Sequence, residues 1–427
     1  MRYVLLLLLL LALPMEASAA RVLTLEQALA IAVENNHDIA KAGEYAKYVH
    51  GKYVEERSAV LPQIGLNAGI TAARDNGQPS FAGGGLNQYD RSLGLSLSQP
   101  LYTWGKIGAA IRAAEIGKST AKEQLRLAQQ AARRDVTTTF CNVLLAKEML
   151  RLSSDNLRQK ERHADEAQKK FAAGVATDYD VLAAEVALEN ARPALIRAEN
   201  QLRMTRERLR FLLVLDEEVE AAGSLEPQMA ALPSLETVQK SALTMRPELL
   251  DLGYRVGIYG ELVTIAAAEN KPRLDLKGSA GWHQLEMGNM TSDGAAWNIG
   301  VYLTFPFFDG LKTSGRVQQA RSDLATKEIE KQQLQENIKL EARNSLNDLQ
   351  EAAEILKALS GTVRQADRLL QMAEKGYELG VKIRLEVDDA QNSLLQAQIN
   401  RAKAATDYMI ARVNLDWVMG RLGEQTN

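Results

Sequence analysis

The chain has 427 residues and a formal net charge of −3, with 46% hydrophobic and 25% charged residues. This composition excludes an intrinsically disordered chain, and the charge balance gives no reason to expect nucleic-acid binding. Aromatic residues make up only 5%, whereas Ala, Leu, Gln, Glu, Lys and Arg are abundant, as is typical of long helices and coiled coils. The length allows two or three ordinary domains or one large elongated one.

The N-terminus carries an export signal. Arg2 precedes an apolar run over residues 3–13, and the small residues at 17–19 follow. This order is that of a secretory signal peptide, so we expect residues 1–19 to be removed and Ala20 to begin the mature chain. The apolar run is shorter than the roughly 20 residues that a membrane-spanning helix needs. No later run is long enough either, so the mature chain is expected to be exported without a transmembrane helix.

The mature sequence begins with a predicted helix. Thr24 and Gln27 have the spacing of a capping box, which marks a helix N-terminus. The apolar residues that follow recur on one face of a helix, and they are Ala28, Ile31, Ala32 and Ile39. A second copy of this helix is expected to begin at Ser234 and to run to Pro247.

Two predicted strands follow each of these helices. Apolar and small polar residues alternate over residues 64–71 and 92–98, and again over 274–283 and 297–305. An alternation of period two over about ten residues is the pattern of transmembrane β-barrel strands. A half-buried sheet of a soluble protein gives the same alternation, so the strands alone favour the soluble alternative.

A very long helical stretch follows each strand pair. Apolar residues recur every seven positions, as in a coiled coil, at Ala342, Leu349, Leu356, Val363 and Leu370. The first copy carries the matching series Val136, Val143, Leu150, Leu157 and Ala164, and its return helix carries Leu188, Leu195, Leu202 and Leu209. Residues 107–172 contain no Pro and few Gly, and roughly 65 helical residues would form a rod of about 100 Å. Pro193 is expected to kink the first return helix.

The chain consists of two copies of one unit. Phe171-Ala-Ala-Gly-Val reappears as Tyr377-Glu-Leu-Gly-Val, an offset of 377 − 171 = 206. Earlier in each copy Pro62 matches Pro272, an offset of 210. We therefore expect a mainly α fold with a transmembrane β portion, built from two tandem repeats of helix, strand pair and long coiled-coil helical hairpin. The expected segments are the signal peptide 1–19, equatorial segments 20–61 and 216–271, strand pairs 62–101 and 272–307, helical hairpins 102–215 and 308–420, and the tail 421–427.

Four strands cannot close a barrel, and unpaired strand edges are costly in lipid, so several chains must pool their strands. Two chains would give eight strands, whose interior is filled by side chains. Three chains would give 12 strands around a channel and 12 long helical segments. The sequence thus favours a trimer that forms a 12-stranded β-barrel and an α-helical barrel.

The whole mature chain resembles the TolC-type outer-membrane efflux proteins. The resemblance is carried by Leu61-Pro62 before the first strand, Gln99-Pro100-Leu-Tyr at the end of the second, and the Phe/Tyr-x-x-Gly-Val hairpin tips. It implies a homotrimer in outer-membrane lipid that extends into the periplasm. It further implies a passive conduit of a tripartite efflux or type I secretion system, with a periplasmic adaptor protein and a proton-driven or ABC-type inner-membrane pump.

The hairpin tips contain the candidate gate. Glu386 and Asp389 are three residues apart and share a helix face, and the resemblance implies acidic rings at these two positions, with Glu here in place of Asp at the first. Stacked acidic rings select for cations. The alternative is an ordinary solvated acidic helix face.

The resemblance also implies a network that holds the gate closed. Its members would be Asp180, Tyr377 and Lys382, with Lys in place of the family's Arg, so that a bidentate contact is lost. Arg384 or Arg162 could substitute for it, and in the alternative reading Tyr377 only packs at the hairpin end.

Two glycines and one cysteine complete the candidate residues. Gly174 and Gly380 fit the left-handed turn that each hairpin needs. Cys141 lies among apolar residues of a helix and is expected to be a buried thiol.

Other chemistry is not expected. The four His residues are scattered, so we predict no metal site, no cofactor and no enzyme activity. A soluble periplasmic coiled-coil adaptor or scaffold remains the alternative function, and an exported enzyme is a third.

Overall fold

The computed structural model describes residues 21–75 and 86–423. The expected signal peptide and most of the Gly-rich loop between the first two strands lie outside the described residues. The chain divides into two compact units. The tip unit comprises the described residues of Met1–Lys41, Arg126–Arg246 and Glu336–Asn427, and the sheet unit comprises those of Ala42–Leu125 and Pro247–Gln335. Each unit contains corresponding parts of both repeats.

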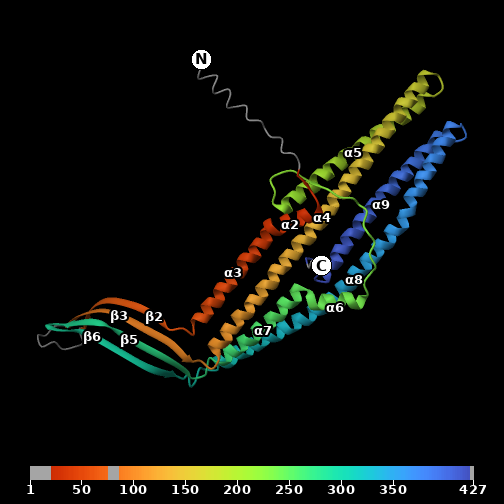
Figure 1. The fold of residues 1–427 in the computed structure, drawn as a ribbon. Coiled ribbons are helices and arrows are strands. Elements are labelled where there is room, and N and C mark those ends of the chain that lie inside the picture. Colours follow the sequence, from red (N-terminus) through yellow and green to blue (C-terminus); the bar gives the residue numbers. More distant parts are fainter. Residues whose placement is uncertain (1–20, 76–85, 424–427) are drawn as a thin grey trace, which may run out of the picture. The chain divides into compact units, whose positions relative to one another are not determined.

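The predicted order of helix, strand pair and long helical hairpin is confirmed in both repeats (Figure 1). The first repeat consists of α2 (Leu25–Asn35), α3 (His37–Ser58), β2 (Gln63–Asp75), β3 (Leu86–Tyr102), α4 (Lys106–Ala172) and α5 (Asp178–Leu213). The second consists of α6 (Leu235–Met245), α7 (Pro247–Ala267), β5 (Arg273–Met287), β6 (Met290–Thr304), α8 (Lys312–Glu378) and α9 (Arg384–Val418). Short strands β1 (Arg21–Leu23) and β4 (Val219–Ala221) pair in parallel. The long helices α4 and α8 each have 67 residues.

The first helix begins as predicted but ends earlier. Thr24 and Gln27 form both bonds of the capping box. The apolar stripe, however, does not run unbroken to Ile39, because α2 ends at Asn35 and the Asn36 side chain caps the next helix by accepting from the Asp38 backbone N–H at 2.8 Å. The single helix expected over this region is therefore two helices.

The second repeat shows the same break. Ser234 caps α6, and Pro247 opens α7, where its missing N–H costs no intrahelical hydrogen bond. Pro193, in contrast, lies inside α5, which continues as a helix on both sides of it.

The sheet has the order β2-β3-β5-β6, with every neighbouring pair antiparallel. One face carries apolar rows across the four strands, such as Leu66, Leu95, Ala280 and Trp297. The opposite face carries small and polar rows, such as Gly65, Ser96, Ser279 and Asn298. The apolar face is not covered, since Leu66 is 70% and Trp297 is 78% exposed. Within the described residues, no helix combines the length and apolar character that crossing a bilayer requires.

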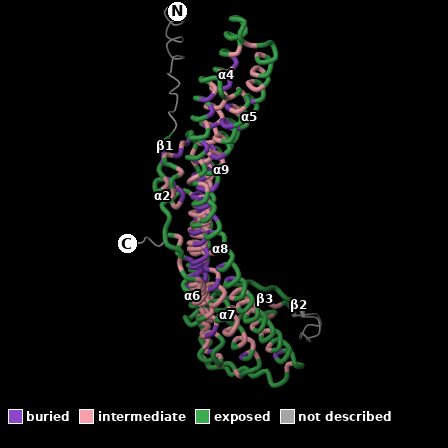
Figure 2. The backbone as a smooth tube through the Cα atoms, turned by 90° about the vertical axis from the view of Figure 1, so that its right-hand side faces the viewer, coloured by how far each residue is buried: buried purple, intermediate pink, exposed green. Residues whose placement is uncertain are grey.

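The predicted heptad residues form the core of the tip unit. Val136 and Val143 of α4 are buried with Leu202 and Leu209 of α5, together with residues of α2, β1 and β4. In the second repeat, the buried heptad residues Ala342, Leu349 and Leu356 of α8 share a cluster with Ala404 and Leu415 of α9 and Val238 of α6. Figure 2 shows this buried stripe along the helices of the unit. Burial of these residues confirms the coiled-coil reading of the sequence.

Candidate gate at the helical hairpin tips

Both hairpins of the tip unit reverse through a left-handed glycine. Gly174 has φ +74° and Gly380 has φ +72°, with open space where a Cβ would lie. The N–H of Val175 donates to the carbonyl of Lys170 at 2.9 Å, and the corresponding bond closes the second turn. These bonds satisfy helix-terminal carbonyls, so each long helix ends in a defined turn rather than fraying.

Asp180 lies in the first turn of α5 and caps that helix. Its carboxylate accepts from the Thr177 backbone N–H at 2.8 Å and from the Thr177 hydroxyl at 2.7 Å. These bonds hold the pKa of Asp180 below its usual range. Asp180 is exposed, and the structure places it against Thr177 rather than against Tyr377 or Lys382 of its own chain.

Lys382 and Glu386 are brought together at the start of α9. Lys382 Nζ forms an ion pair with Glu386 Oε1, and the Ile383 backbone N–H donates to Glu386 Oε2 at 3.1 Å. Both bonds lower the pKa of Glu386, and the bond from Lys382 has the larger effect. Asp389 is exposed one turn further along. One proposed lock residue thus contacts one proposed ring residue, a pairing whose only sequence signal was the spacing of four.

Tyr377 combines apolar packing with polar contacts. Its ring packs on the cluster of Ala373, Val387 and Ala390 at the α8–α9 end. Lys170 Nζ of α4 donates to the Tyr377 hydroxyl at 3.2 Å and lies 4.8 Å from its ring centroid. Tyr377 therefore links the second hairpin to the first within one chain, through a residue that sequence reasoning did not identify.

Further contacts join α4 to α9. Lys160 Nζ donates to Asp388 Oδ1 at 3.3 Å, and the guanidinium of Arg384 lies 3.9 Å from Glu166 and 3.4 Å from Asp388. The Arg384–Asp388 pair lies within α9 at a spacing of four. For Lys160–Asp388 and Arg384–Glu166 the sequence carried no signal, because partners so far apart along the chain are set by tertiary register alone. The two hairpins of one chain are thus held together by charged groups near their ends.

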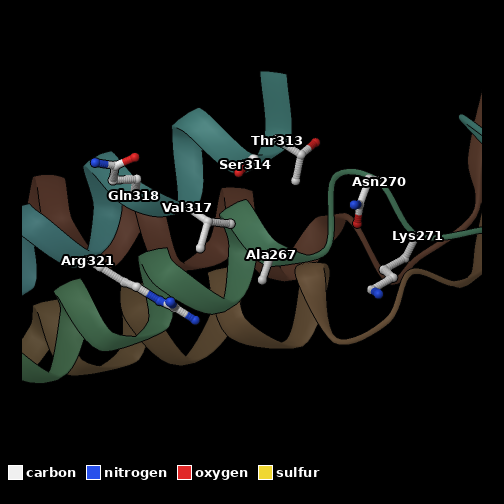
Figure 3. A pocket seen from close by; sticks show the side chains of 8 residues that line it. All are labelled: Ala267, Asn270, Lys271, Thr313, Ser314, Val317, Gln318 and Arg321. Carbon is white, nitrogen blue, oxygen red and sulfur yellow. The ribbon is translucent and has the colours of Figure 1, made fainter. Parts of the chain in front are cut away.

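A separate cavity of about 590 Å³ lies in the sheet unit between α7 and α8. Figure 3 shows Lys271 and Arg321 at its two ends, with the hydroxyl-bearing Thr313 and Ser314 on the α8 side. No His, Cys, Asp or Glu lines this cavity, so its lining offers no acid–base pair.

The remaining candidate for reactivity is Cys141, which is fully buried in α4. Burial raises the pKa of its thiol to about 11, which leaves it protonated and unreactive at neutral pH. Among the residues that the structure describes, no group of three or more His, Cys, Asp or Glu is placed to hold a metal ion.

Comparisons with known proteins agree with this architecture. The chain is 24% identical over 415 residues to the outer membrane protein TolC of Escherichia coli, a match that covers 92% of this chain and 81% of TolC. It is 27% identical over 409 residues to the cobalt-zinc-cadmium resistance protein CzcC of Cupriavidus metallidurans, covering 94% and 91%. A crystal structure of a membrane protein from Pseudomonas aeruginosa superposes with a TM-score of 0.82 at 23% identity, covering 93% of each chain.

The family model described as outer membrane efflux protein matches residues 28–213 and 238–421, that is, both repeats and most of the chain. The chain belongs to the outer membrane efflux protein family.

Proposed function

We propose that the chain is the outer-membrane channel subunit of a tripartite efflux or type I secretion system, in which it serves as a passive conduit from the periplasm to the exterior. One observation carries this proposal above the others. The sheet exposes a largely apolar face, and among the described residues its edge strands, β2 and β6, each pair on one side only. An apolar face suits lipid, but open strand edges do not, since each unpaired backbone group in lipid costs several kcal/mol.

Closure by other copies of the chain resolves this conflict. Two copies would supply eight strands, and the interior of an eight-stranded barrel is filled by side chains. Three copies would supply twelve strands, with the polar face of Ser96, Ser279 and Asn298 turned to a water-filled lumen. The long helices would continue the same conduit into the periplasm as an α-helical barrel. A homotrimer in the outer membrane is thus the assembly that the sheet favours.

Partners follow from the family. A channel without catalytic groups needs an energy source elsewhere, so we expect a periplasmic adaptor protein and an inner-membrane pump, either proton-driven or ABC-type. The relatives include a protein named for cobalt, zinc and cadmium resistance, whereas within the part of this chain that the structure describes no group of three or more His, Cys, Asp or Glu is placed to hold a metal ion. Cargo choice is therefore assigned to the pump and adaptor, and the channel performs no reaction.

The gate is proposed at the hairpin tips. In a trimer, Glu386 and Asp389 would be repeated around the tunnel mouth, where their charge would attract cations. Asp180, Tyr377 and Lys382 would hold the tips closed. The carboxylate of Asp180 is exposed, which supports a contact with a hairpin of a neighbouring subunit. Asp180 would then bond that hairpin and Thr177 at the same time. The position of Tyr377 between two hairpins supports a role in closure.

Lipid contact by the apolar face tests the membrane assignment directly. Trp297 lies on that face and should be quenched by phospholipids brominated on their acyl chains. Trp297→Phe should remove a large share of this quenching, whereas Trp417→Phe, which alters a tryptophan of the tip unit, should leave it unchanged. A detergent-free, water-soluble protein whose tryptophans are untouched by brominated lipid would instead support the coiled-coil scaffold.

A further inference from the structure

A polar pair sits between the two hairpins of one subunit, about three helical turns from the first hairpin turn. His163 of α4 and Gln391 of α9 lie with their Nε2 atoms 2.9 Å apart. The pair is flanked by the Lys160–Asp388 contact on one side and the Arg384–Glu166 contact on the other. Each of these three contacts within the tip unit joins a residue of one hairpin to a residue of the other.

We propose that His163 and Gln391 form a proton-sensitive fastening between the two hairpins, which loosens when His163 takes up a proton and so favours opening of the tips in acid. This inference rests on the proposed gated channel. It assigns to His163 a positioning role, since the residue acts through the helices that it joins.

Burial explains why the pair is sensitive to charge. The His163 side chain is 16% exposed and Gln391 is 4% exposed. His163 Nδ1 and Gln391 Oε1 are both buried without a hydrogen-bond partner. A charged imidazolium has two N–H donors and no lone pair, and burial of this ring opposes the full charge. The fastened arrangement therefore accommodates the neutral ring and penalises the charged one.

The geometry of the bond leads to the same result. With Gln391 donating from its amide nitrogen, His163 Nε2 must offer a lone pair, which an imidazolium does not have. Rotating the amide by 180° would present Oε1 to the ring, but it would move the amide NH₂ into the buried position where Oε1 now has no partner. Protonation of His163 thus either breaks its bond with Gln391 or forces the amide to rotate, which buries the Gln391 NH₂ group without an acceptor.

The charges around the ring come from both packed helices. On α4 these are Lys160 and Glu166, and on α9 they are Arg384 and Asp388. Burial is the largest cause that lowers the pKa of His163, followed by the nearby Arg384 charge, and both outweigh the opposing effects of Asp388 and Glu166. Glu166 Oε2 is 3.9 Å from His163 Nδ1, too far for a hydrogen bond.

The neighbouring helices add no stronger partner. Glu185 of α5 accepts from Gln168 at 3.0 Å, and Tyr377 of α8 accepts from Lys170. The pKa of His163 is lowered while the pair is intact, so the imidazole binds a proton more tightly once the helices separate and it is exposed to water. The fastened arrangement is therefore fully stable above the ordinary His range and loses stability as pH falls through it.

The test compares channel gating in His163→Gln with the wild type, in the full-length protein in planar bilayers. Between about pH 7.5 and about pH 5.5, wild-type open probability should rise roughly threefold or more, as expected for release of one lowered histidine pKa per subunit. His163→Gln keeps a neutral hydrogen-bonding side chain and should change by less than about twofold over that range. His50→Gln, at an exposed histidine of α3, serves as the matched control and should respond as the wild type does.

A second readout follows the fastening itself. Amide hydrogen exchange of the peptides that contain residues 160–172 and 384–391 should increase in acid in the wild type relative to His163→Gln at the same pH. Equal exchange in both proteins, or an equal pH response of their conductance, would overturn the inference while leaving the channel intact. Absence of channels from every variant would contradict the proposed function instead, and the exchange measurement would still report on the fastening.

Discussion

Gly420 at the end of α9 is a point where three segments of the tip unit meet. Its φ is +72°, and a Cβ added there would lie 2.7 Å from the carbonyl carbon of Met245 and 2.8 Å from the backbone nitrogen of Arg246. Its carbonyl accepts from Gln130 Nε2 of α4 at 2.9 Å. We therefore predict that Gly420→Ala destabilises the helical part of the protein.

The magnitude follows from two separate costs. An alanine in the left-handed region costs about 1 kcal/mol relative to glycine. The clash is with backbone at the α6–α7 junction, which cannot turn aside as a flexible side chain would, and overpacking of this kind costs about 1–3 kcal/mol. The sum is about 2–4 kcal/mol, and a shift of the Gly420 carbonyl would also weaken its bond from Gln130.

Thermal unfolding in detergent, followed by the helical circular dichroism signal, measures this effect. Gly420→Ala should lower the midpoint by about 4 °C or more. Gly361→Ala is the matched control, because Gly361 lies inside α8 with no heavy atom within 4 Å of an added Cβ. The control should be neutral or stabilising by about 0.5–1 kcal/mol. If both variants unfold at the wild-type midpoint, Gly420 does not make the close approach on which the reasoning depends.

Three further predictions concern the tips and the buried thiol. Replacing Glu386 and Asp389 with Ala should weaken cation selectivity and block by multivalent cations in bilayers, and a wild-type response from the double variant would argue against the ring. Because the pKa of Glu386 is lowered, the cation selectivity of the wild type should persist as pH falls into the ordinary Glu range. Replacing Asp180 and Lys382 with Ala should raise single-channel conductance, and an unchanged value would remove the proposed lock. Cys141 should resist a thiol reagent at neutral pH until the protein is unfolded, since its thiol is buried with a pKa of about 11; rapid labelling of the native protein would contradict its burial.

The elements that sequence predicts best are those whose signal is local and repeated. Heptads at Val136 and Ala342 predict burial because the same side of a helix recurs every seven residues. The strands were predicted too short because their ends lack a regular local pattern. Asp90 and Arg91 interrupt the apolar alternation, yet both lie within β3, where Arg91 donates to Gln284 at 2.8 Å and to Glu286 at 2.7 Å on the neighbouring strand.

The tips show the same limit at the level of single residues. Thr177 and Asp180 have capping-box spacing, so the local role of Asp180 was readable from sequence. The contacts of Lys170 with Tyr377 and of His163 with Gln391 were not, because they depend on how two hairpins from different repeats align. Such pairs are set by tertiary register, which no spacing within one helix encodes.

Planar-bilayer conductance of the detergent-purified protein, with the mass of the inserted species determined in parallel, tests the central claim most directly. The proposed function predicts discrete, cation-selective openings from a species of three times the protomer mass. A water-soluble species that never inserts would contradict the membrane channel and leave a periplasmic coiled-coil scaffold as the better account of the same helices.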